Sequence, residues 1–190
     1  HTYASSLQAT TAIAVRADGR FLVAWNTMVS NPGDISDTSV HAQRFSADGV
    51  AQGSEFQVND YTTNYQWLPA VAVDAEGDFV VVWQSMGASS GDTAGYSLHA
   101  QRYSAAGTAL GDPFQVNSYT TSDQTASAVA VDADGDFVVV WKSTGSSFGD
   151  NSLGSIQGQR FRVTGDLQGT VWVDQDLDGL FDALDPQCPS

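Results

Sequence analysis

Basic residues are scarce in this chain of 190 residues. Lysine and arginine together number 7 against 22 aspartate and glutamate residues, so the formal net charge is −15 and the sequence pI is about 4.1. A surface of that sign repels the phosphate backbone of nucleic acids and the headgroups of anionic lipids, whereas it attracts divalent cations. The composition therefore argues against nucleic-acid binding and favours a cation such as calcium.

Cysteine and long apolar runs are nearly absent as well. The single cysteine is Cys188, which excludes an internal disulfide and leaves either a bridge to another chain or an unpaired thiol. The longest strictly apolar runs, among them 79–83 and 137–141, are five residues long, whereas a membrane helix needs about 20, so we predict no membrane span. The sequence starts at His1 without a basic-then-apolar leader, which leaves open a removed signal peptide or a trimmed chain.

What the chain does contain is one unit repeated three times. Trp25, Trp83 and Trp141 are separated by 58 residues each, with no insertion between copies. The same interval relates Gly19, Gly77 and Gly135; Asp34, Asp92 and Asp150; Arg44, Arg102 and Arg160; Phe56, Phe114 and Trp172; Gln8, Gln66 and Gln124. A period of this length indicates a repeat architecture. We therefore divide the chain into a three-repeat domain, 1–174, with copies 1–58, 59–116 and 117–174, and a tail, 175–190.

Each copy has the pattern of short strands between turn residues. In the second copy, the apolar run 70–73 and a second, Val-rich run at 78–85 flank a turn at 74–77, which predicts a hairpin of two buried strands. Further strands are expected at 98–103 and 114–117, after a Gly/Ser-rich loop at 86–96 and a turn at 105–108. Four antiparallel strands with the most apolar pair inside are typical of a propeller blade.

The predicted fold is therefore all-β, with three four-stranded propeller-like blades and a C-terminal calcium loop. The alternative is a β-trefoil-like barrel, which also has three four-stranded repeats. Closed propellers have four or more blades, so three blades leave sheet edges open, and open edges favour pairing with another chain. We expect the chain to close a ring between subunits or to stack as an open array.

The recurring segments Gln-Arg-Phe, Phe-Gln-Val-Asn, Tyr-Thr-Thr and Ala-Val-Ala-Val-Asp-Ala-Asp-Gly-Asp-Phe-Val-Val-Val-Trp resemble the tandem repeats of very large bacterial secreted and surface proteins. The resemblance covers residues 1 to about 174. Those proteins are propeller-like and adhesin-like, so the resemblance implies an extracellular or cell-surface location. It carries no specific activity.

The tail resembles a different family. The run Asp-Gln-Asp-Leu-Asp-Gly-Leu-Phe-Asp-Ala-Leu-Asp at 174–185, followed by Cys188 and Pro189, is similar to the thrombospondin type 3 calcium repeat and has the spacing of other twelve-residue calcium loops. The resemblance implies calcium ligands at Asp174, Asp176, Asp178, Asp182 and Asp185, together with the carbonyl of Leu180. Two features depart from the family: Leu177 stands where Gly is common, and one repeat is present instead of many.

Calcium suits these residues because it takes six to eight oxygen ligands, which a loop with oxygens at positions 1, 3, 5, 7, 9 and 12 supplies. Gly179 provides the sharp turn that position 6 requires. The alternative is a solvated acidic tail. A weaker calcium candidate is the acidic hairpin turns at 74–78 and 132–136, but Arg16 and Arg20 occupy the equivalent places in the first copy, which favours ordinary hairpin turns.

Other recurring residues favour structural roles. We expect the ring of Trp83 to pack between blades, with sugar stacking as the alternative, and Arg102 to pair with a nearby carboxylate. His41 and His99 are equivalent, but Gln157 replaces them in the third copy, which argues against a repeated metal or catalytic histidine.

The sequence offers no nucleophile beside a base and no zinc-ligand spacing, so we predict that the chain is not an enzyme. The leading hypothesis is an extracellular structural or adhesive repeat protein that self-assembles with copies of itself through open strand edges, into a filament or closed oligomer stabilised by calcium. The alternative is a multivalent carbohydrate-binding, lectin-like module, for which Tyr96 and Phe148 would supply aromatic rings; glycans or other surface proteins would then be partners.

Overall fold

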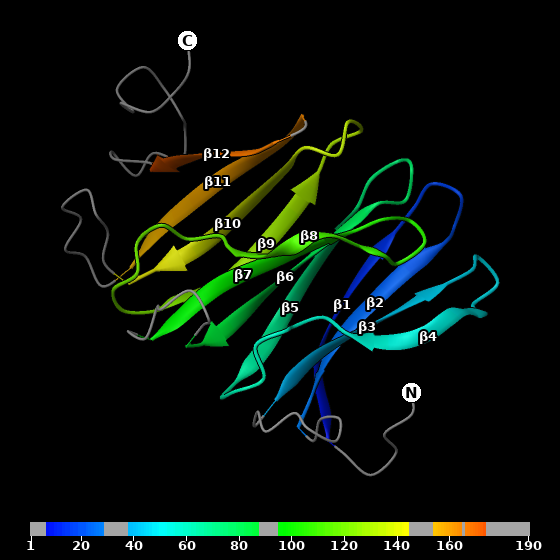
Figure 1. Ribbon diagram of the computed structural model, residues 1–190, viewed down its shortest axis with the longest axis horizontal. Coiled ribbons are helices and arrows are strands. Elements are labelled where there is room, and N and C mark those ends of the chain that lie inside the picture. The colour runs from blue at the N-terminus through cyan, green and yellow to red at the C-terminus, as the bar shows by residue number, and fades with distance from the viewer. Residues whose placement is uncertain (1–6, 29–37, 88–94, 145–153, 165, 174–190) are drawn as a thin grey trace.

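The computed structural model is built from β-strands (Figure 1), and it describes residues 7–28, 38–87, 95–144, 154–164 and 166–173. The all-β class predicted from the sequence is confirmed. Across these ranges no helix is present that has the length and apolar character needed to cross a bilayer.

Twelve strands form three four-stranded antiparallel sheets, which we call blades 1 to 3. Blade 1 contains β1 (Gln8–Val15), β2 (Phe21–Thr27), β3 (Ser39–Phe45) and β4 (Ala51–Gln57). Blade 2 contains β5 (Gln66–Val73), β6 (Phe79–Met86), β7 (Tyr96–Tyr103) and β8 (Ala109–Gln115). Blade 3 contains β9 (Gln124–Val131), β10 (Phe137–Ser143), β11 (Ser155–Thr164) and β12 (Asp166–Val173). In every blade the strands follow one another in chain order across the sheet.

The largest differences from the expected strand boundaries are at β5 and β8. β5 starts at Gln66, four residues before the predicted start, because a register shift between Trp67 and Ala70 lets the strand continue through Leu68, whose φ is +49°. β8 covers Ala109–Gln115, so the predicted strand at 114–117 overlaps only its end. A period-2 pattern does not reveal such bulged strands, since a bulge interrupts the alternation.

The hairpin turn between the first two strands of each blade depends on glycine. Gly19, Gly77 and Gly135 have φ values of +84°, +98° and +83°, a region that side chains other than glycine rarely adopt. In blade 2, Oδ1 of Asp74 accepts hydrogen bonds from the backbone N–H groups of Gly77 and Asp78, at 2.8 and 2.9 Å. The Asp-x-x-Gly pattern of the second and third copies thus encodes this turn directly, and the first copy keeps the glycine with Arg16 in place of the aspartate.

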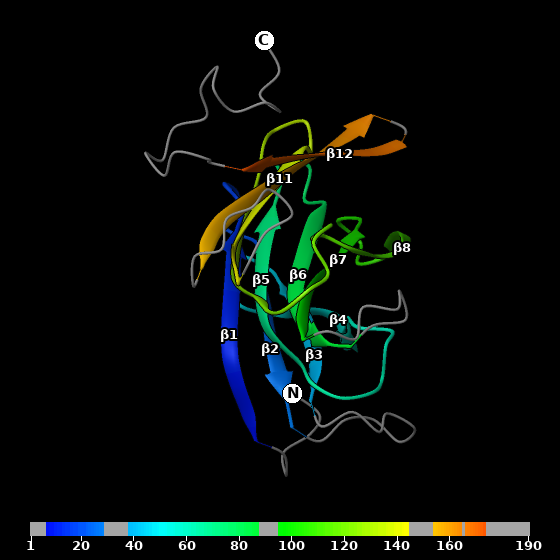
Figure 2. The ribbon, with the colours of Figure 1, turned by 90° about the vertical axis from the view of Figure 1, so that its left-hand side faces the viewer.

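The blades lie side by side, with the first strand of each on the inside. β1 contacts β5, and β5 contacts β9, as Figures 1 and 2 show for β1 and β5. Each four-stranded sheet is separate from the next, which is the propeller arrangement and not the single barrel of the trefoil alternative.

Each blade has two faces because side chains alternate across a strand. One carries aromatic rings and is called the aromatic face: Phe21, Val23, Trp25 and Phe45 in blade 1; Phe79, Val81, Trp83 and Tyr103 in blade 2; Phe137, Val139, Trp141 and Phe161 in blade 3. The other is called the aliphatic face: Leu22, Ala24, Val40 and Ala42 in blade 1; Val80, Val82, Leu98 and Ala100 in blade 2; Val138, Val140, Ile156 and Gly158 in blade 3.

The core lies between unlike faces. The aliphatic face of blade 1 and the aromatic face of blade 2 form one hydrophobic cluster, and the aliphatic face of blade 2 and the aromatic face of blade 3 form the other. Trp83 is buried in the first of these clusters, which confirms that its ring packs between blades. Both interfaces between blades are therefore contacts of an aliphatic face with an aromatic face.

Candidate functional site

The aromatic face of blade 1 lies at one end of the row of blades. No described strand packs on it, since β5 is the element of another blade that contacts β1, β2 and β3. Phe21, Val23 and Phe45 are half-buried there, whereas Phe79, Val81 and Tyr103 at the equivalent places of blade 2 are buried. A hollow of about 370 Å³ lies on this face, lined by Val23, Trp25 and Phe45 among others.

The aromatic faces of blades 2 and 3 each carry a stacked pair of rings with a third ring beside it, whereas blade 1 has the stacked pair alone. Phe79 and Tyr103 stack at 5.0 Å between centroids, and Phe56 of the preceding blade lies 5.1 Å from Tyr103. Phe137 and Phe161 stack at 4.7 Å, with Phe114 of the preceding blade 5.2 Å from Phe161. In blade 1, Phe21 and Phe45 stack at 4.9 Å, and no third ring is recorded beside this pair among the described residues.

The aliphatic face of blade 3 lies at the opposite end. Val140 is 39% exposed and Ile156 is 64% exposed. At the equivalent places, Ala24, Val82, Val40 and Leu98 are completely buried, at 0%. The two ends of the described chain are therefore one aromatic and one aliphatic face, each of the kind that packs internally against the other kind. These open surfaces are sheet faces; assembly through open strand edges, which the sequence led us to expect, stays a prediction.

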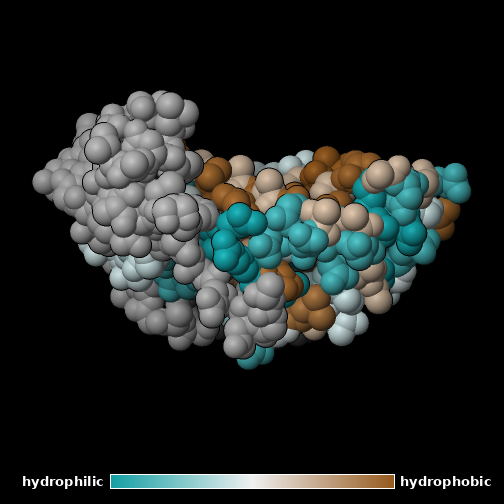
Figure 3. All heavy atoms as spheres, turned by 90° about the horizontal axis from the view of Figure 1, so that it is seen from above, coloured by the Kyte–Doolittle hydropathy of each residue, from teal (hydrophilic) through white to brown (hydrophobic). Residues whose placement is uncertain are grey.

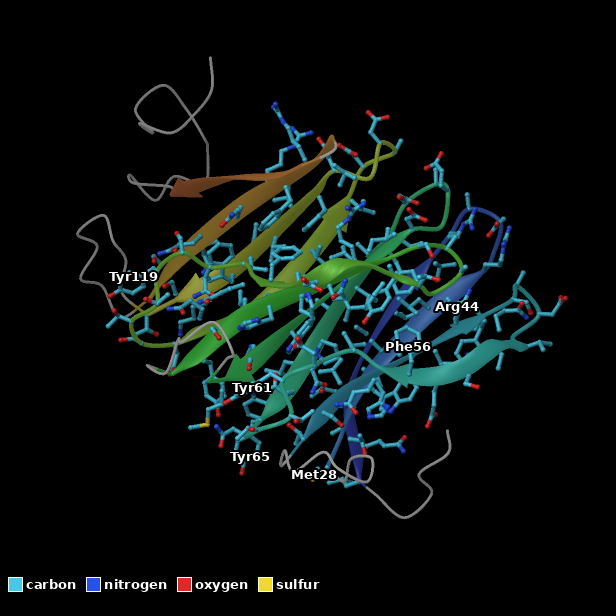
Figure 4. All side chains as sticks on the ribbon, viewed as in Figure 1. Met28, Arg44, Phe56, Tyr61, Tyr65 and Tyr119 are labelled. Carbon is cyan, nitrogen blue, oxygen red and sulfur yellow. The ribbon has the colours of Figure 1, made fainter. Side chains whose placement is uncertain are left out.

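A pocket of about 90 Å³ opens at the turn end of blades 1 and 2, and its lining includes Arg16, Arg20 and Arg44. These are three of the seven basic residues of the chain. Figure 4 shows Arg44 at this end of the blade, away from Met28, Tyr61 and Tyr65. Figure 3 shows hydrophilic and apolar residues mixed at the surface of the right-hand end, which blade 1 forms in Figure 1.

The three arginines of this pocket have neighbours of their own. Nη2 of Arg16 donates to the carbonyl of Ala75 at 2.8 Å and lies 3.3 Å from Oδ2 of Asp18. Nη1 of Arg44 donates to the carbonyl of Ala105 at 2.7 Å. Arg20 is 58% exposed and pairs with Asp18 at 2.9 Å. The backbone N–H of Arg20, a hydrogen bond to its guanidinium and the charge of Arg16 together lower the pKa of Asp18.

The equivalent turn of blade 3 is acidic. Oδ1 of Asp132 accepts hydrogen bonds from the backbone N–H groups of Asp134 and Asp136 at 3.1 and 3.0 Å. Oδ2 of Asp132 and Oδ2 of Asp136 lie 3.3 and 3.1 Å from Nη2 of Arg160. These carboxylates thus act as acceptors within the turn and as ion-pair partners.

The predicted calcium ligands at the tail, from Asp174 to Asp185, lie outside the described residues, as do Asp34, Asp92, Asp150 and Phe148. Within the part of the chain that the structure does describe, no group of three or more His, Cys, Asp or Glu side chains is placed to hold a metal ion. The calcium loop therefore stays a prediction from the sequence.

The remaining recurring residues take structural places. His41 and His99 are buried, lie 3.1 and 3.2 Å from the hydroxyls of Ser39 and Ser97, and lie beside the rings of Trp25 and Trp83. Arg102 lines a small pocket between blades 2 and 3 together with Asp74 and Asp78. Burial raises the pKa of Asp74, with further increases from the charges of Asp78 and Glu76.

No family model and no curated protein matches the chain. Solved structures with a similar fold include an endo-arabinase from Bacteroides thetaiotaomicron VPI-5482 at 12% identity and a TM-score of 0.53, covering 86% of this chain and 59% of that one. The parainfluenza virus 5 hemagglutinin-neuraminidase ectodomain matches at 8% identity and a TM-score of 0.53, covering 87% and 44%. The Kuenenia stuttgartiensis hydrazine synthase matches at 11% and 0.51, covering 88% and 55%.

These comparisons show the propeller-like fold, and the chain spans about half the length of the structures that it matches. They also correct one prediction. The statement that the chain is not an enzyme is wrong as argued, because the endo-arabinase and the neuraminidase are enzymes with the same fold. A repeated scaffold does not exclude catalysis, since catalytic sites are grafted onto folds and are independent of them.

Sequence reasoning missed the two open faces and the arginine-lined pocket. The signal was present in the repeat itself: Arg16 and Arg20 of the first copy replace Asp74 and Asp78 of the second. We interpreted this replacement only as evidence against calcium at the turns. Because the arginines come together with residues of blade 2, their meeting place depends on how the blades pack.

Proposed function

We propose that this chain is an extracellular structural or adhesive repeat protein that self-assembles through its two end faces. The observation that carries the proposal is that the open aromatic face of blade 1 and the open aliphatic face of blade 3 are a complementary pair. Faces of these two kinds already pack against each other at both internal blade interfaces.

The proposed partner is a second copy of the chain, with blade 3 of one copy on blade 1 of the next. Val140 and Ile156 would then take the places that Ala24, Val82, Val40 and Leu98 take internally.

Burial of apolar side chains favours such an association. Fully burying a Val, Ile or Phe side chain contributes roughly 1.5–3 kcal/mol relative to leaving it in water, and the exposed or half-buried residues are Val140 and Ile156 on one end face and Phe21, Val23 and Phe45 on the other. Opposing this, each copy has a net charge of −15, and like charges repel over about 8–10 Å at physiological salt. Association therefore depends both on apolar contact and on neutralisation of the negative charge.

This repulsion gives calcium a role. The acidic run at 174–185 starts directly after β12, whose last residue is Val173. Calcium bound there would neutralise several carboxylates close to the blade that carries the open aliphatic face. We propose that calcium stabilises the assembly in this way.

The contact is heterologous, because one face of each copy meets the other face of the next. Such contacts give a closed ring where the rotation between copies closes, and a filament where it does not. Either product buries the end faces, so both support the proposal.

The test is the mass of the particle as a function of concentration, measured by sedimentation velocity with calcium. The wild type is expected to form dimers or larger particles, and Ile156→Asp is expected to stay monomeric. Tyr119→Ala, a change away from both end faces, is the matched control and is expected to assemble. A wild type that stays monomeric at high micromolar concentration would refute the proposal.

A second candidate function is carbohydrate binding, and one observation favours it. Tyr65, Trp67 and Tyr96 of blade 2 form an aromatic cluster, with centroids 6.2 and 5.6 Å apart, and Tyr65 is 38% exposed. Leu7, Ala9 and Thr38 occupy the equivalent places in blade 1, and Asp123, Thr125 and Gly154 in blade 3. Aromatic rings with one wet edge suit stacking on sugar rings. A glycan array that gives a signal lost in Tyr65→Ala and kept in Tyr119→Ala would support this function.

A further inference from the structure

The principal backbone contacts between blades lie on the inner strands. Among the described strands, β5 contacts β1, β2 and β3 of blade 1, and β9 contacts β5, β6 and β7 of blade 2. The first strand of each following blade is thus the strand that comes closest to the blade before it. Blades that approach at one edge and diverge at the other radiate from the close edge, so the row of blades is an arc and not a straight stack.

The sizes of the side chains explain this wedge. On the aliphatic face, every inner strand carries alanine at two positions: 12 and 14, 70 and 72, 128 and 130. The fourth strand instead carries a phenylalanine on this face, Phe56 in blade 1 and Phe114 in blade 2, whose ring lies against rings of the next blade. Small side chains let two sheets approach and large rings hold them apart, because a packed interior leaves no voids. The same wedge therefore turns blade 2 from blade 1 and blade 3 from blade 2.

Both ends of the arc are open on their inner strands as well. On the aromatic face of β1, Ile13 is 61% exposed, whereas its equivalent Val71 is half-buried and packs on the cluster between blades 1 and 2. On the aliphatic face of β9, Ala130 is exposed, whereas its equivalent Ala72 is buried in the cluster between blades 2 and 3. The surfaces that join neighbouring blades near the inner edge are thus uncovered at both ends.

The number of blades in a ring follows from the repeat. Each copy of the chain contributes three blades, and the proposed contact between copies pairs the same two kinds of face as the internal contacts. A ring of such copies therefore holds a multiple of three blades. Closed propellers have about four to eight blades, and the multiple of three within that range is six. One copy is too few to close, and three copies are too many.

We infer that two copies of this chain close one six-bladed ring, in which blade 3 of each copy packs on blade 1 of the other. The inference rests on the self-association proposed above and excludes its filament product. The ring contains two equivalent interfaces, each between the aromatic face of one copy and the aliphatic face of the other. Because both end faces of both copies are then covered, no such face is left to recruit a third copy.

The mass of the particle is the first test. In sedimentation velocity with calcium, the wild type is expected to reach twice the 20.1 kDa of one chain and to gain no further mass as its concentration rises. A mass that keeps growing, or a particle of three or more copies, would overturn the six-bladed ring and leave the proposed self-assembly standing. A wild type that stays monomeric would remove both.

Mixing distinguishes the ring from a dimer joined through two like faces. Ile156→Asp damages the aliphatic end face and Ile13→Asp the aromatic one, and both side chains are more than half exposed in one copy, so both variants are expected to fold, as circular dichroism checks. In the ring, a pair of either variant with wild type keeps one of two contacts. Such a pair is expected to be at least about 100-fold weaker than the wild-type pair, because the second contact of a ring forms within one particle.

The pairs are counted by native mass spectrometry of each variant mixed with isotope-labelled wild type. Tyr119→Ala, the control, keeps both end faces and is expected to exchange statistically with wild type. Scarce mixed pairs with both Ile13→Asp and Ile156→Asp would support the ring. A dimer joined through two aromatic faces would mix freely with Ile156→Asp, and one joined through two aliphatic faces would mix freely with Ile13→Asp; either result would overturn the ring.

Discussion

Phe21 and Phe45 stack with their ring centroids 4.9 Å apart and an angle of 12° between the ring planes, on a face that no described strand covers. The stacked pairs Phe79–Tyr103 and Phe137–Phe161 have nearly the same geometry, at 5.0 and 4.7 Å, inside buried clusters. The geometry of the blade 1 pair therefore comes from its own sheet, because no described strand of another blade packs on it.

Replacing these phenylalanines should have unequal effects on the isolated chain. Phe161 is buried, so Phe161→Ala is expected to lower the free energy of unfolding by about 3–5 kcal/mol. Phe45 is half-buried, so Phe45→Ala is expected to lower it by less than about 2 kcal/mol. Urea unfolding at low protein concentration measures both. Equal losses would mean that the open face is already covered in the monomer.

An acidic residue on the aliphatic face should separate assembly from folding. Val140→Asp lies on the open face of blade 3 and is expected to change the unfolding free energy by less than about 1 kcal/mol while it abolishes association. Val82→Asp is its internal equivalent and is completely buried, so we expect it to prevent folding, because an unpaired charge would be buried. Circular dichroism and sedimentation compare the two; a Val140→Asp protein that still assembles would contradict the assignment of this face.

Two glycines with positive φ, Gly77 in a hairpin turn and Gly111 in β8, should differ in their tolerance of alanine. Gly77→Ala combines an unfavourable φ of +98° with a clash against the Arg16 guanidinium, and we expect a loss of about 1–3 kcal/mol. Gly111 has φ at +73° but nothing within 4 Å of a new Cβ, so Gly111→Ala should lose about 1 kcal/mol from the backbone alone. Thermal unfolding ranks the two variants, and the reverse order would argue against the contact between Arg16 and the blade 2 turn.

Asp74 predicts a pH dependence of stability. Burial raises its pKa above the ordinary value of 3.8, so the folded chain binds this proton more tightly than the unfolded chain. Ionisation of Asp74 therefore lowers stability at neutral pH, and this loss disappears as the pH falls through the raised pKa towards 3.8. Asp74→Asn keeps an oxygen for the N–H groups of Gly77 and Asp78. We expect it to be more stable than wild type at pH 7, with a difference that shrinks to nothing below about pH 3.8; urea unfolding across this range gives the difference, and one that grows on acidification would be inconsistent with a raised pKa.

Calcium removal should weaken the assembly. With chelator, the wild type is expected to show a smaller particle mass, because the carboxylates at 174–185 then repel one another and the neighbouring copy. Asp178→Asn removes one predicted ligand and should raise the calcium concentration required for assembly, as measured by calorimetry and sedimentation. Asp112→Asn, the same change on blade 2 outside the tail, is the control. If the particle mass does not change with chelator, self-association does not depend on calcium.

The repeat made much of the fold predictable. A 58-residue period with Val-rich strands and Asp-x-x-Gly turns is local information, and local information is sufficient to predict four-stranded units, their hairpins and the burial of Trp83. Local information was insufficient to predict where the bulged strand β5 starts, because Leu68 adopts a positive φ that its residue type does not predict. Because the sequence shows no catalytic pattern, we also predicted that the chain is not an enzyme. The fold does not support that prediction, since enzymes share it.

The sequence by itself determined that three equivalent blades form and that each blade has one aromatic and one aliphatic face, since both follow from residue order within a strand. Only the tertiary structure decided which faces meet and which remain open. Equivalent residues such as Val82 and Val140 are 0% and 39% exposed, because burial depends on whether a neighbouring blade is present. For the same reason, Arg16, Arg20 and Arg44 become a pocket only when blade 2 brings Gly77 and Ala105 to them.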